Sequence, residues 1–284
     1  MKTFRVRLAQ TKPVLGDLDA NLATHVEMTT QAADEGLDLI VFPELSLTGY
    51  YLRDLVPDIA IRRNDPRLDA LCELSHRTGI VAGFIEESDE FGFFTVSVYF
   101  EGGQIAGLHR KVYLPTYGMF DEGRYISGGR RVGCFDTALG RAGILVCEDL
   151  WHPALPYVLS QDRMQVLIAP SNSPTRGVQG DELASSTVYN DMLATYARLF
   201  ACHVIYCNRV GYEDGVNFWG GSRVLDPFGD VLVQAPLFDE GVFDATIDPA
   251  EVRRARLSAP LLEDENVDLT MRELRRITDG RPGD

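Results

Sequence analysis

The 284-residue sequence contains no apolar run of the roughly 18 to 20 residues that a membrane-spanning helix needs. Its first residues alternate apolar and basic side chains and lack the apolar core of a secretory signal. From these absences we expect a soluble, cytoplasmic protein. Positive charge is scarce, because 27 lysines and arginines stand against 42 aspartates and glutamates, giving a net charge of -15. Such a chain repels phosphate groups, which argues against nucleic acid and anionic membranes as partners.

Cysteine and histidine show none of the spacings typical of a metal site. The five cysteines include no C-x-x-C pair, and the five histidines include no H-x-x-x-H pair. An odd number of cysteines in a chain too long to need disulfides indicates free thiols. The glycine pairs at 102–103 and 128–129 lack the strand-turn-helix pattern of nucleotide binding and indicate turns. We therefore expect no metal and no cofactor.

Apolar runs rich in Val, Ile and Phe alternate with amphipathic segments along the chain. The runs predict strands at 4–9, 37–42, 80–85, 93–100, 142–147, 166–169, 203–207 and 222–225. The amphipathic segments predict helices at 17–36, with Asp17 as N-cap, at 65–79, with Asp65 as N-cap, and at 181–200. This alternation, without a linker or repeat, predicts a single α/β domain over 1–257. Residues 258–284 are expected to form an amphipathic C-terminal arm or a partly ordered tail.

Three predicted strands lead into side chains that can take part in catalysis. Glu44 and Lys111 each follow an apolar strand, and Cys147 ends one. Taken singly, they have ordinary interpretations as a salt-bridged acid, a solvated lysine and an inert buried thiol. Together they supply the proton acceptor, fixed positive charge and nucleophile that acyl transfer needs. A cysteine at a strand-to-turn junction also resembles a nucleophile elbow, where the following backbone N–H groups stabilise an oxyanion.

The segments 42–44 (Phe-Pro-Glu), 110–111 (Arg-Lys) and 147–149 (Cys-Glu-Asp) resemble, in order and spacing, the Glu-Lys-Cys signature of the nitrilase superfamily of carbon–nitrogen hydrolases. The resemblance extends to the glycine-serine strand at 220–229 and covers nearly the whole chain. The amino-acid sequences of these motifs are most similar to those in the glutaminase domain of glutamine-dependent NAD synthetases. The resemblance implies a nitrilase-like α-β-β-α sandwich and a homodimer or higher homo-oligomer.

The resemblance also gives each catalytic residue a role. Cys147, as thiolate, attacks the carbonyl carbon of an amide. Glu44 accepts the thiol proton, passes it to the departing ammonia and then deprotonates the water that cleaves the thioester. Lys111 and the backbone N–H of Glu148 stabilise the oxyanion. Glu122, as the second glutamate of the family, orients Lys111 and the substrate amide.

Further residues match substrate contacts of the glutaminase branch. Tyr117, Trp151 and Ser173 occupy such positions, although a packing role is equally open for the aromatic side chains. The arginine that binds the substrate carboxylate in family glutaminases is absent, because its position falls on Gln179. Arg176 lies nearby and would replace it only if the loop is rearranged. Free glutamine is therefore one candidate substrate among others.

The sequence thus predicts a thiol-dependent amidohydrolase that cleaves a small primary amide, either an ω-amide or a glutamine-like compound, through a thioester on Cys147. Nitrile hydrolysis is an alternative, because it uses the same three residues. The segment 127–129 (Ser-Gly-Gly) is followed by two arginines and does not match the ATP-pyrophosphatase signature of a synthetase half. A second alternative is therefore a glutaminase-like subunit that supplies ammonia to a separate ATP-dependent synthetase.

Overall fold

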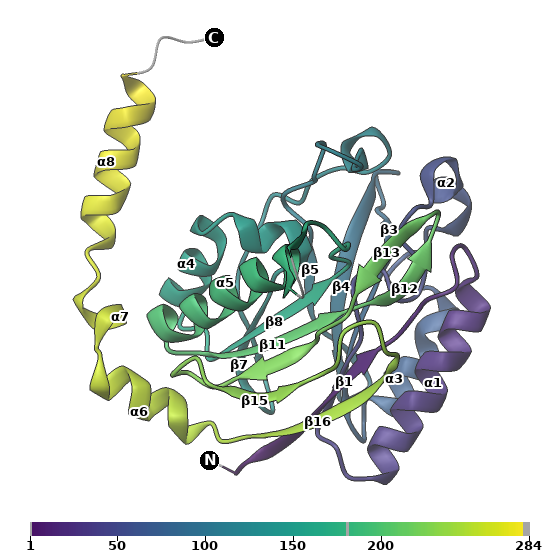
Figure 1. Ribbon diagram of the computed structural model, residues 1–284, viewed down its shortest axis with the longest axis horizontal. Coiled ribbons are helices and arrows are strands. Elements are labelled where there is room, and N and C mark those ends of the chain that lie inside the picture. Colours follow the sequence, from purple (N-terminus) through teal and green to yellow (C-terminus); the bar gives the residue numbers. More distant parts are fainter. Residues whose placement is uncertain (1, 180–181, 281–284) are drawn as a thin grey trace.

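The computed structural model describes residues 2–179 and 182–280. Two large sheets pack face to face, and helices cover the outer face of each (Figure 1). The first sheet has six strands in the order β16 (Gly241–Ile247), β1 (Phe4–Gln10), β2 (Leu39–Val41), β3 (Gly79–Glu87), β4 (Phe93–Glu101) and β5 (Gln104–Arg110). The second has six in the order β15 (Val231–Gln234), β14 (Arg223–Leu225), β11 (His203–Asn208), β8 (Val166–Ser171), β7 (Gly140–Ile144) and β6 (Phe135–Thr137). This arrangement is the α-β-β-α sandwich expected from the sequence.

The main core lies between the two sheets. Val6 and Leu8 of β1 and Val41 of β2 pack in one cluster with Ile168 of β8 and Ile205 of β11, and all five side chains are buried. Alternate residues of the same strands face the helices, because successive side chains of a strand point to opposite faces. The central strands are thus buried on both faces, which explains why they appear in the sequence as continuous apolar runs.

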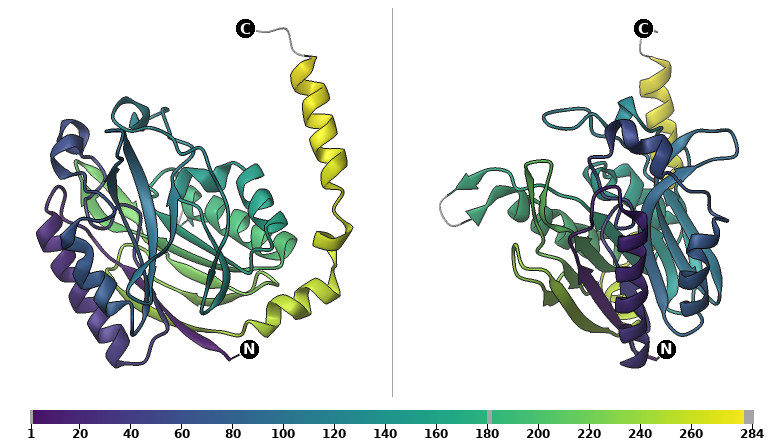
Figure 2. Two further views of the ribbon diagram at one scale, coloured as in Figure 1. Left: turned by 180° about the vertical axis from the view of Figure 1, so that it is seen from behind. Right: turned by 90° about the vertical axis from the view of Figure 1, so that its right-hand side faces the viewer.

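Separate clusters join the helices to the outer faces of the sheets. Helices α1 (Leu18–Asp34) and α3 (Asp69–Leu74) cover the first sheet, and α4 (Ala154–Gln161) and α5 (Ala184–Phe200) cover the second (Figure 2). The smaller elements are α2 (Val56–Ile59), the 3-10 turns η1 (Arg53–Leu55), η2 (Pro66–Leu68), η3 (Glu122–Arg124) and η4 (Cys147–Trp151), and the hairpins β9 (Val178–Gln179) with β10 (Glu182–Leu183) and β12 (Val210–Glu213) with β13 (Val216–Trp219).

The local signals at the ends of α1 operate as the sequence predicts. The Asp17 carboxylate accepts a hydrogen bond from the Ala20 N–H at 3.0 Å. Gly36 follows the helix with a φ of 73°, a left-handed conformation that costs glycine little. The prediction of a helix over 17–36 is therefore correct apart from its flanking residues.

The helix predicted over 65–79 is too long. Asp65 caps it as expected, with its carboxylate accepting the Arg67 N–H at 2.9 Å, but the chain first forms η2 and α3 ends at Leu74. Gly79 does not end a helix; it begins β3, and its N–H donates to Asp38 O at 2.9 Å. Pairing with the neighbouring strand, a long-range contact, decides this boundary against the helical pattern.

Other predicted boundaries also differ from the structure. Strand β2 is shorter than the predicted 37–42, and β7 ends at Ile144, before the predicted end at Cys147. One further backbone hydrogen bond continues each strand. The Phe42 N–H donates to Val81 O after β2, and the Leu145 N–H donates to Ile168 O after β7. Helix α5 begins after the short strand β10, whereas the first residue of the predicted 181–200 helix lies outside the described residues.

The C-terminal arm leaves the body of the molecule as a series of helices (Figure 1). After α6 (Ala250–Ser258) come α7 (Leu261–Asp264) and α8 (Val267–Asp279). The side chains of the predicted apolar pattern on α8 are exposed: Leu269, Met271, Leu274 and Ile277. Across the described ranges, no helix combines the length and apolar character required to span a bilayer.

Candidate active site

The topology brings several strand ends to one end of the sandwich. Strands β1, β2 and β3 are parallel, as are β7, β8 and β11. Strand β5 runs in the same direction as β3, because both pair antiparallel with β4. Glu44 follows β2, Lys111 follows β5 directly and Cys147 follows β7. Loops at the carboxyl ends of such strands are held by a rigid scaffold and remain accessible.

Lys111 joins the two predicted glutamates. Its Nζ lies 2.8 Å from Glu44 Oε1 and 2.8 Å from Glu122 Oε1, and all three side chains are at least nine-tenths buried. The other oxygen of Glu44, Oε2, accepts the backbone N–H of Asn172 at 2.9 Å. The structure therefore brings together the base, the cation and the second glutamate that the sequence analysis selected.

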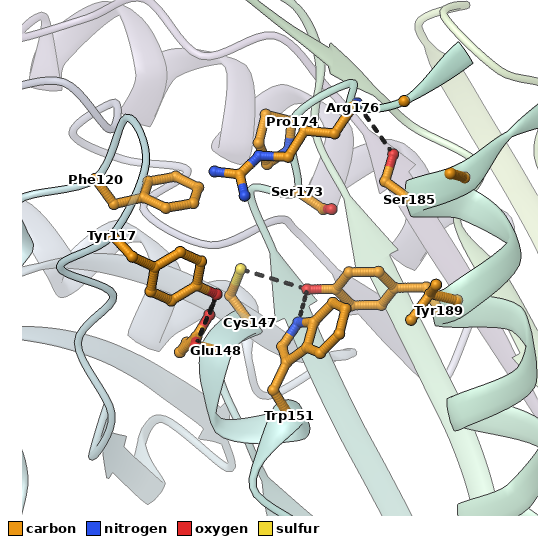
Figure 3. Close-up of a pocket in the computed structure, with 13 residues that line it drawn as sticks. Tyr117, Phe120, Cys147, Glu148, Trp151, Ser173, Pro174, Arg176, Ser185 and Tyr189 are labelled. Carbon is orange, nitrogen blue, oxygen red and sulfur yellow. Dashed lines mark hydrogen bonds between the residues drawn. The ribbon is translucent and has the colours of Figure 1, made fainter. Parts of the chain in front are cut away.

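Cys147 lies at the start of a strained turn. It has a φ of 48° and begins η4, so its side chain and the following N–H groups leave the sheet abruptly. The sulfur lies against a cavity of about 330 Å³, and its Sγ is 3.7 Å from the Tyr189 hydroxyl. Figure 3 shows it between Tyr117 and Glu148 on one side and Tyr189 and Trp151 on the other.

Asp149 fixes this turn relative to Lys111. Its Oδ2 accepts the Val146 N–H at 3.1 Å and contacts His109 Nε2 at 2.8 Å. Its Oδ1 accepts the N–H groups of Val112 and Tyr113 at 3.0 and 2.9 Å. One fully buried carboxylate thus ties the turn of Cys147 to the segment that carries Lys111. Asp149 lies within the Cys-Glu-Asp motif, but the motif alone does not indicate this structural role.

Electrostatics keep the thiol protonated at rest. Burial raises the pKa of the Cys147 thiol, the negative charge of Glu44 raises it further, and Lys111 lowers it. Burial by itself lowers the pKa of Lys111, but Glu122 and Glu44 together hold that pKa well above its usual value. Burial also raises the pKa of Glu122. The lysine therefore stays an ammonium, and formation of a thiolate requires transfer of its proton to a nearby base.

All five predicted substrate-contact residues line the cavity beside Cys147: Tyr117, Glu148, Trp151, Ser173 and Arg176. The Tyr117 hydroxyl donates to the Glu148 carboxylate, with oxygen separations of 3.0 and 2.9 Å. Burial and this carboxylate raise the pKa of Tyr117 to about 12, so the phenol remains a donor. Burial raises the pKa of Glu148.

Arg176 reaches the cavity from the loop after β8. Its guanidinium carbon lies 4.6 Å from the Phe120 ring centroid and 5.9 Å from that of Tyr117. Its Nη2 is buried without a hydrogen-bond partner among the residues that the structure describes. Gln179, which holds the family arginine's place in the sequence, is part of β9. The chain therefore already places a cation in the cavity at position 176.

Phe120 and Tyr189 are among the cavity residues that were not singled out from the sequence. Tyr189 of α5 contacts Cys147 and accepts the indole N–H of Trp151 at 3.3 Å, and Phe120 forms the wall beneath Arg176. Tyr189 lies in a segment whose sequence predicts only a helix, and a tyrosine in such a helix is normally expected to be a core residue. Its contact with the site depends on how α5 packs, and no local pattern carries that information.

Within the described residues, no group of three or more His, Cys, Asp or Glu side chains could hold a metal ion. All five cysteines are free thiols. The side chains gathered at the site are a cysteine, a lysine and carboxylates.

The family model for carbon-nitrogen hydrolases matches residues 5–257. The chain belongs to the carbon–nitrogen hydrolase family. This carbon–nitrogen hydrolase is 36% identical over 265 residues to a glutamine-dependent NAD(+) synthetase of Thermotoga maritima, covering 92% of this chain and 45% of that protein. It thus spans about half the length of the curated relatives it matches.

Solved structures agree with this assignment. The glutamine-dependent NAD+ synthetase of Acinetobacter baumannii matches with a TM-score of 0.78 and 31% identity, over 88% of this hydrolase and 47% of that chain. A carbon-nitrogen hydrolase from Helicobacter pylori matches with a TM-score of 0.83 and 22% identity, over 97% and 99% of the two chains. The second likeness shows that the whole sandwich is shared.

Proposed function

We propose that this hydrolase cleaves the C–N bond of a small primary amide through a thioester on Cys147. The observation that carries the proposal is the placement of Lys111 between Glu44 and Glu122, close enough to Cys147 that the charges of Glu44 and Lys111 act on its thiol. The Cys147 sulfur itself borders the cavity. A fixed ammonium stabilises most strongly the negative charge that appears only in the transition state. Membership of the family supports the hydrolase class, and the geometry supports the choice of residues.

The proposed reaction has two halves. Glu44 takes the proton of the Cys147 thiol as Sγ forms a bond to the carbonyl carbon, and the oxyanion accepts hydrogen bonds from Lys111 and the Glu148 N–H. The C–N bond then breaks, and Glu44 passes its proton to the leaving nitrogen, which departs as ammonia. Water, deprotonated by Glu44, attacks the thioester, and the acid leaves as the thiol is restored.

The charges of the cavity favour a substrate with both an ammonium and a carboxylate. Arg176 offers a cation whose Nη2 is buried and has no hydrogen-bond partner within the described part of the chain, and the Glu148 carboxylate lies on the opposite side of Cys147 (Figure 3). Arginine binds carboxylates through two parallel hydrogen bonds. We therefore infer that an ω-amide of an amino acid, such as glutamine, is preferred over an uncharged amide.

The experiment is detection of the acyl-enzyme by intact mass. The protein is mixed rapidly with glutamine, asparagine, acetamide, propionamide and the nitriles of the same acids, then quenched in acid. An added acyl mass that peptide mapping places on Cys147, together with released ammonia, supports the proposal and names the acyl group. Turnover without any adduct, and undiminished in Cys147→Ala, contradicts it. Turnover of the nitriles alone would establish the nitrilase alternative.

A second proposal concerns the use of the ammonia. Two relatives, 36% and 30% identical, are glutamine-dependent NAD synthetases in which a region like this chain forms about half of the protein. We infer that this chain can pass ammonia to a separate ATP-dependent synthetase. A glutaminase rate that rises when such a synthetase and its substrates are added supports this, and an unchanged rate contradicts it. Self-association into a homodimer stays a prediction, which sedimentation velocity tests.

A further inference from the structure

A buried ion pair runs along β12, from Arg209 just before the strand to Glu213 at its end, and neither residue lines the cavity. Arg209 Nη1 is 2.7 Å from Glu213 Oε2, and the two side chains are 0% and 4% exposed. The guanidinium also stacks on Phe218, 4.4 Å from its ring centroid. Burying two charges is costly and by itself adds little to stability. The other contacts of Arg209 and Glu213 should therefore explain why this ion pair is buried.

The second oxygen of Glu213 holds the loop that follows Glu44. Its Oε1 accepts the backbone N–H groups of Tyr50 and Tyr51 at 2.8 and 2.7 Å. Gly49 permits this close approach, because it has a φ of 80° and a Cβ there would lie 2.8 Å from Leu15 Cα and 3.2 Å from Glu213 Oε2. The hairpin and the loop are thus joined through the Glu213 carboxylate, because one of its oxygens binds Arg209 and the other accepts two backbone N–H groups of the loop.

Tyr50 connects this junction to the catalytic cluster. Its hydroxyl donates to Glu122 Oε1 at 2.5 Å, the same oxygen that Lys111 Nζ contacts at 2.8 Å. Its ring is edge-on to Phe218, with centroids 6.1 Å apart. Burial holds the pKa of Tyr50 well above its usual value, so the hydroxyl stays protonated and can donate.

We propose that Arg209 and Glu213 are positioning residues of the hydrolase site, which hold Tyr50 so that its hydroxyl turns the Glu122 carboxylate toward Lys111. The inference rests on the proposed function. Without the hydrogen bond from Tyr50, the Glu122 carboxylate is free to rotate away from the lysine. Lys111 is then drawn toward Glu44, and the positive charge leaves the position that the oxyanion requires.

The pH dependence gives a direct readout of this coupling. The titratable groups near Glu122 are Lys111, Glu44, Tyr50, Cys147 and Glu148. Burial raises the pKa of Glu122, and the hydrogen bond from Tyr50 is one of the contacts that lower it. Losing that bond raises the pKa, so Glu122 takes up a proton at higher pH. The acid limb of the kcat profile then moves to higher pH, both when Tyr50 loses its hydroxyl and when Glu213 no longer holds it.

A double-mutant cycle tests the proposal with Glu213→Gln, Tyr50→Phe and the double variant. The matched control is Asp214→Asn on the same hairpin, because Asp214 is exposed and forms a salt bridge with the exposed Arg53. Glu213→Gln sets an amide NH2 donor either against the Arg209 guanidinium or against the Tyr50 and Tyr51 N–H groups, so one side of the junction loses its acceptor. The variant should lower kcat about 10- to 100-fold, the cost of a misplaced catalytic group, with a smaller change in KM. In the Tyr50→Phe background it should have little further effect, and Asp214→Asn should match the wild type.

Additive effects of the two substitutions, or an unshifted acid limb, would overturn the proposal. If Glu213→Gln fails to fold, Arg209→Lys keeps the charge and should show the same shift with a smaller rate loss. The rate of Cys147 alkylation by iodoacetamide, followed by intact mass, gives a readout that needs no substrate. If no amide is hydrolysed at all, the proposed function fails. The same double-mutant cycle, measured by the alkylation rate of Cys147, still decides whether Glu213 acts through Tyr50.

Discussion

Lys111 Nζ lies 2.8 Å from Glu44 Oε1, and neither side chain is exposed to solvent. Glu122 contacts the same ammonium, so one positive charge is shared by two buried carboxylates. In the proposed mechanism, a proton that moves from Cys147 to Glu44 reduces the negative charge next to the lysine. The ammonium would then be free to interact with the oxyanion, which would couple the proton transfer to stabilisation of the transition state.

Removing the lysine should cost both stability and activity. We expect Lys111→Met to lower the free energy of unfolding by about 3 to 5 kcal/mol, because two buried carboxylates lose their counter-charge. Ammonia release should be abolished. Urea unfolding at pH 7 measures the first effect, with the exposed Lys2→Met as control. A variant of wild-type stability would contradict the arrangement of three shared charges.

Two cysteine variants separate the nucleophile from an ordinary thiol. Cys147→Ala should abolish ammonia release with the fold intact, since alanine keeps the Cβ and the backbone of the turn. Cys134→Ala should leave turnover nearly unchanged, because Cys134 lies away from the cavity and its Sγ contacts Leu159 O at 3.5 Å. Ammonia assays and circular dichroism check both variants, and normal turnover by Cys147→Ala would exclude the assignment.

Arg176 should decide between charged and uncharged amides. Arg176→Gln removes the cation but keeps a polar side chain, so kcat/KM for glutamine should fall about 10- to 100-fold, the equivalent of about 1.5 to 3 kcal/mol. The value for propionamide should change little. Arg124→Gln, at an exposed arginine outside the cavity, is the control. Equal losses for both amides would show that Arg176 stabilises the loop and does not recognise a carboxylate.

His25 should make stability depend on pH below neutrality. Burial lowers its pKa from 6.5 to about 4, and its ring lies between Asn21 O at 2.7 Å and Ser46 Oγ at 2.9 Å. Between pH 6.5 and 4 the unfolded chain binds a proton that the folded chain does not, so stability falls as the pH falls. The contribution of His25 between pH 7 and 5 is about 2 kcal/mol.

Urea unfolding at the two pH values tests this prediction in wild type, His25→Gln and His76→Gln. The first variant should be less stable at pH 7 but should lose less stability on going to pH 5. The second removes an exposed histidine and should follow the wild type. An unchanged pH dependence in His25→Gln would show that other groups bind the protons.

The sequence by itself determined those features that depend on neighbouring residues. Strand periodicity and the caps at Asp17 and Asp65 are local, so the α/β class and most elements could be predicted. The ordered motifs around Glu44, Lys111 and Cys147 also lie in short segments. For that reason the family resemblance, and with it the sandwich fold, could be inferred before any coordinates.

The tertiary structure decided which distant groups meet. Glu213 reaches the backbone of Tyr50 across 163 positions, and the Asn172 N–H reaches Glu44 across 128. Tyr189 looks like a core residue of a helix until the packing of α5 places its hydroxyl beside Cys147. Strand pairing likewise made Gly79 the start of β3. These outcomes depend on how two sheets align, and no local pattern of side chains contains that alignment.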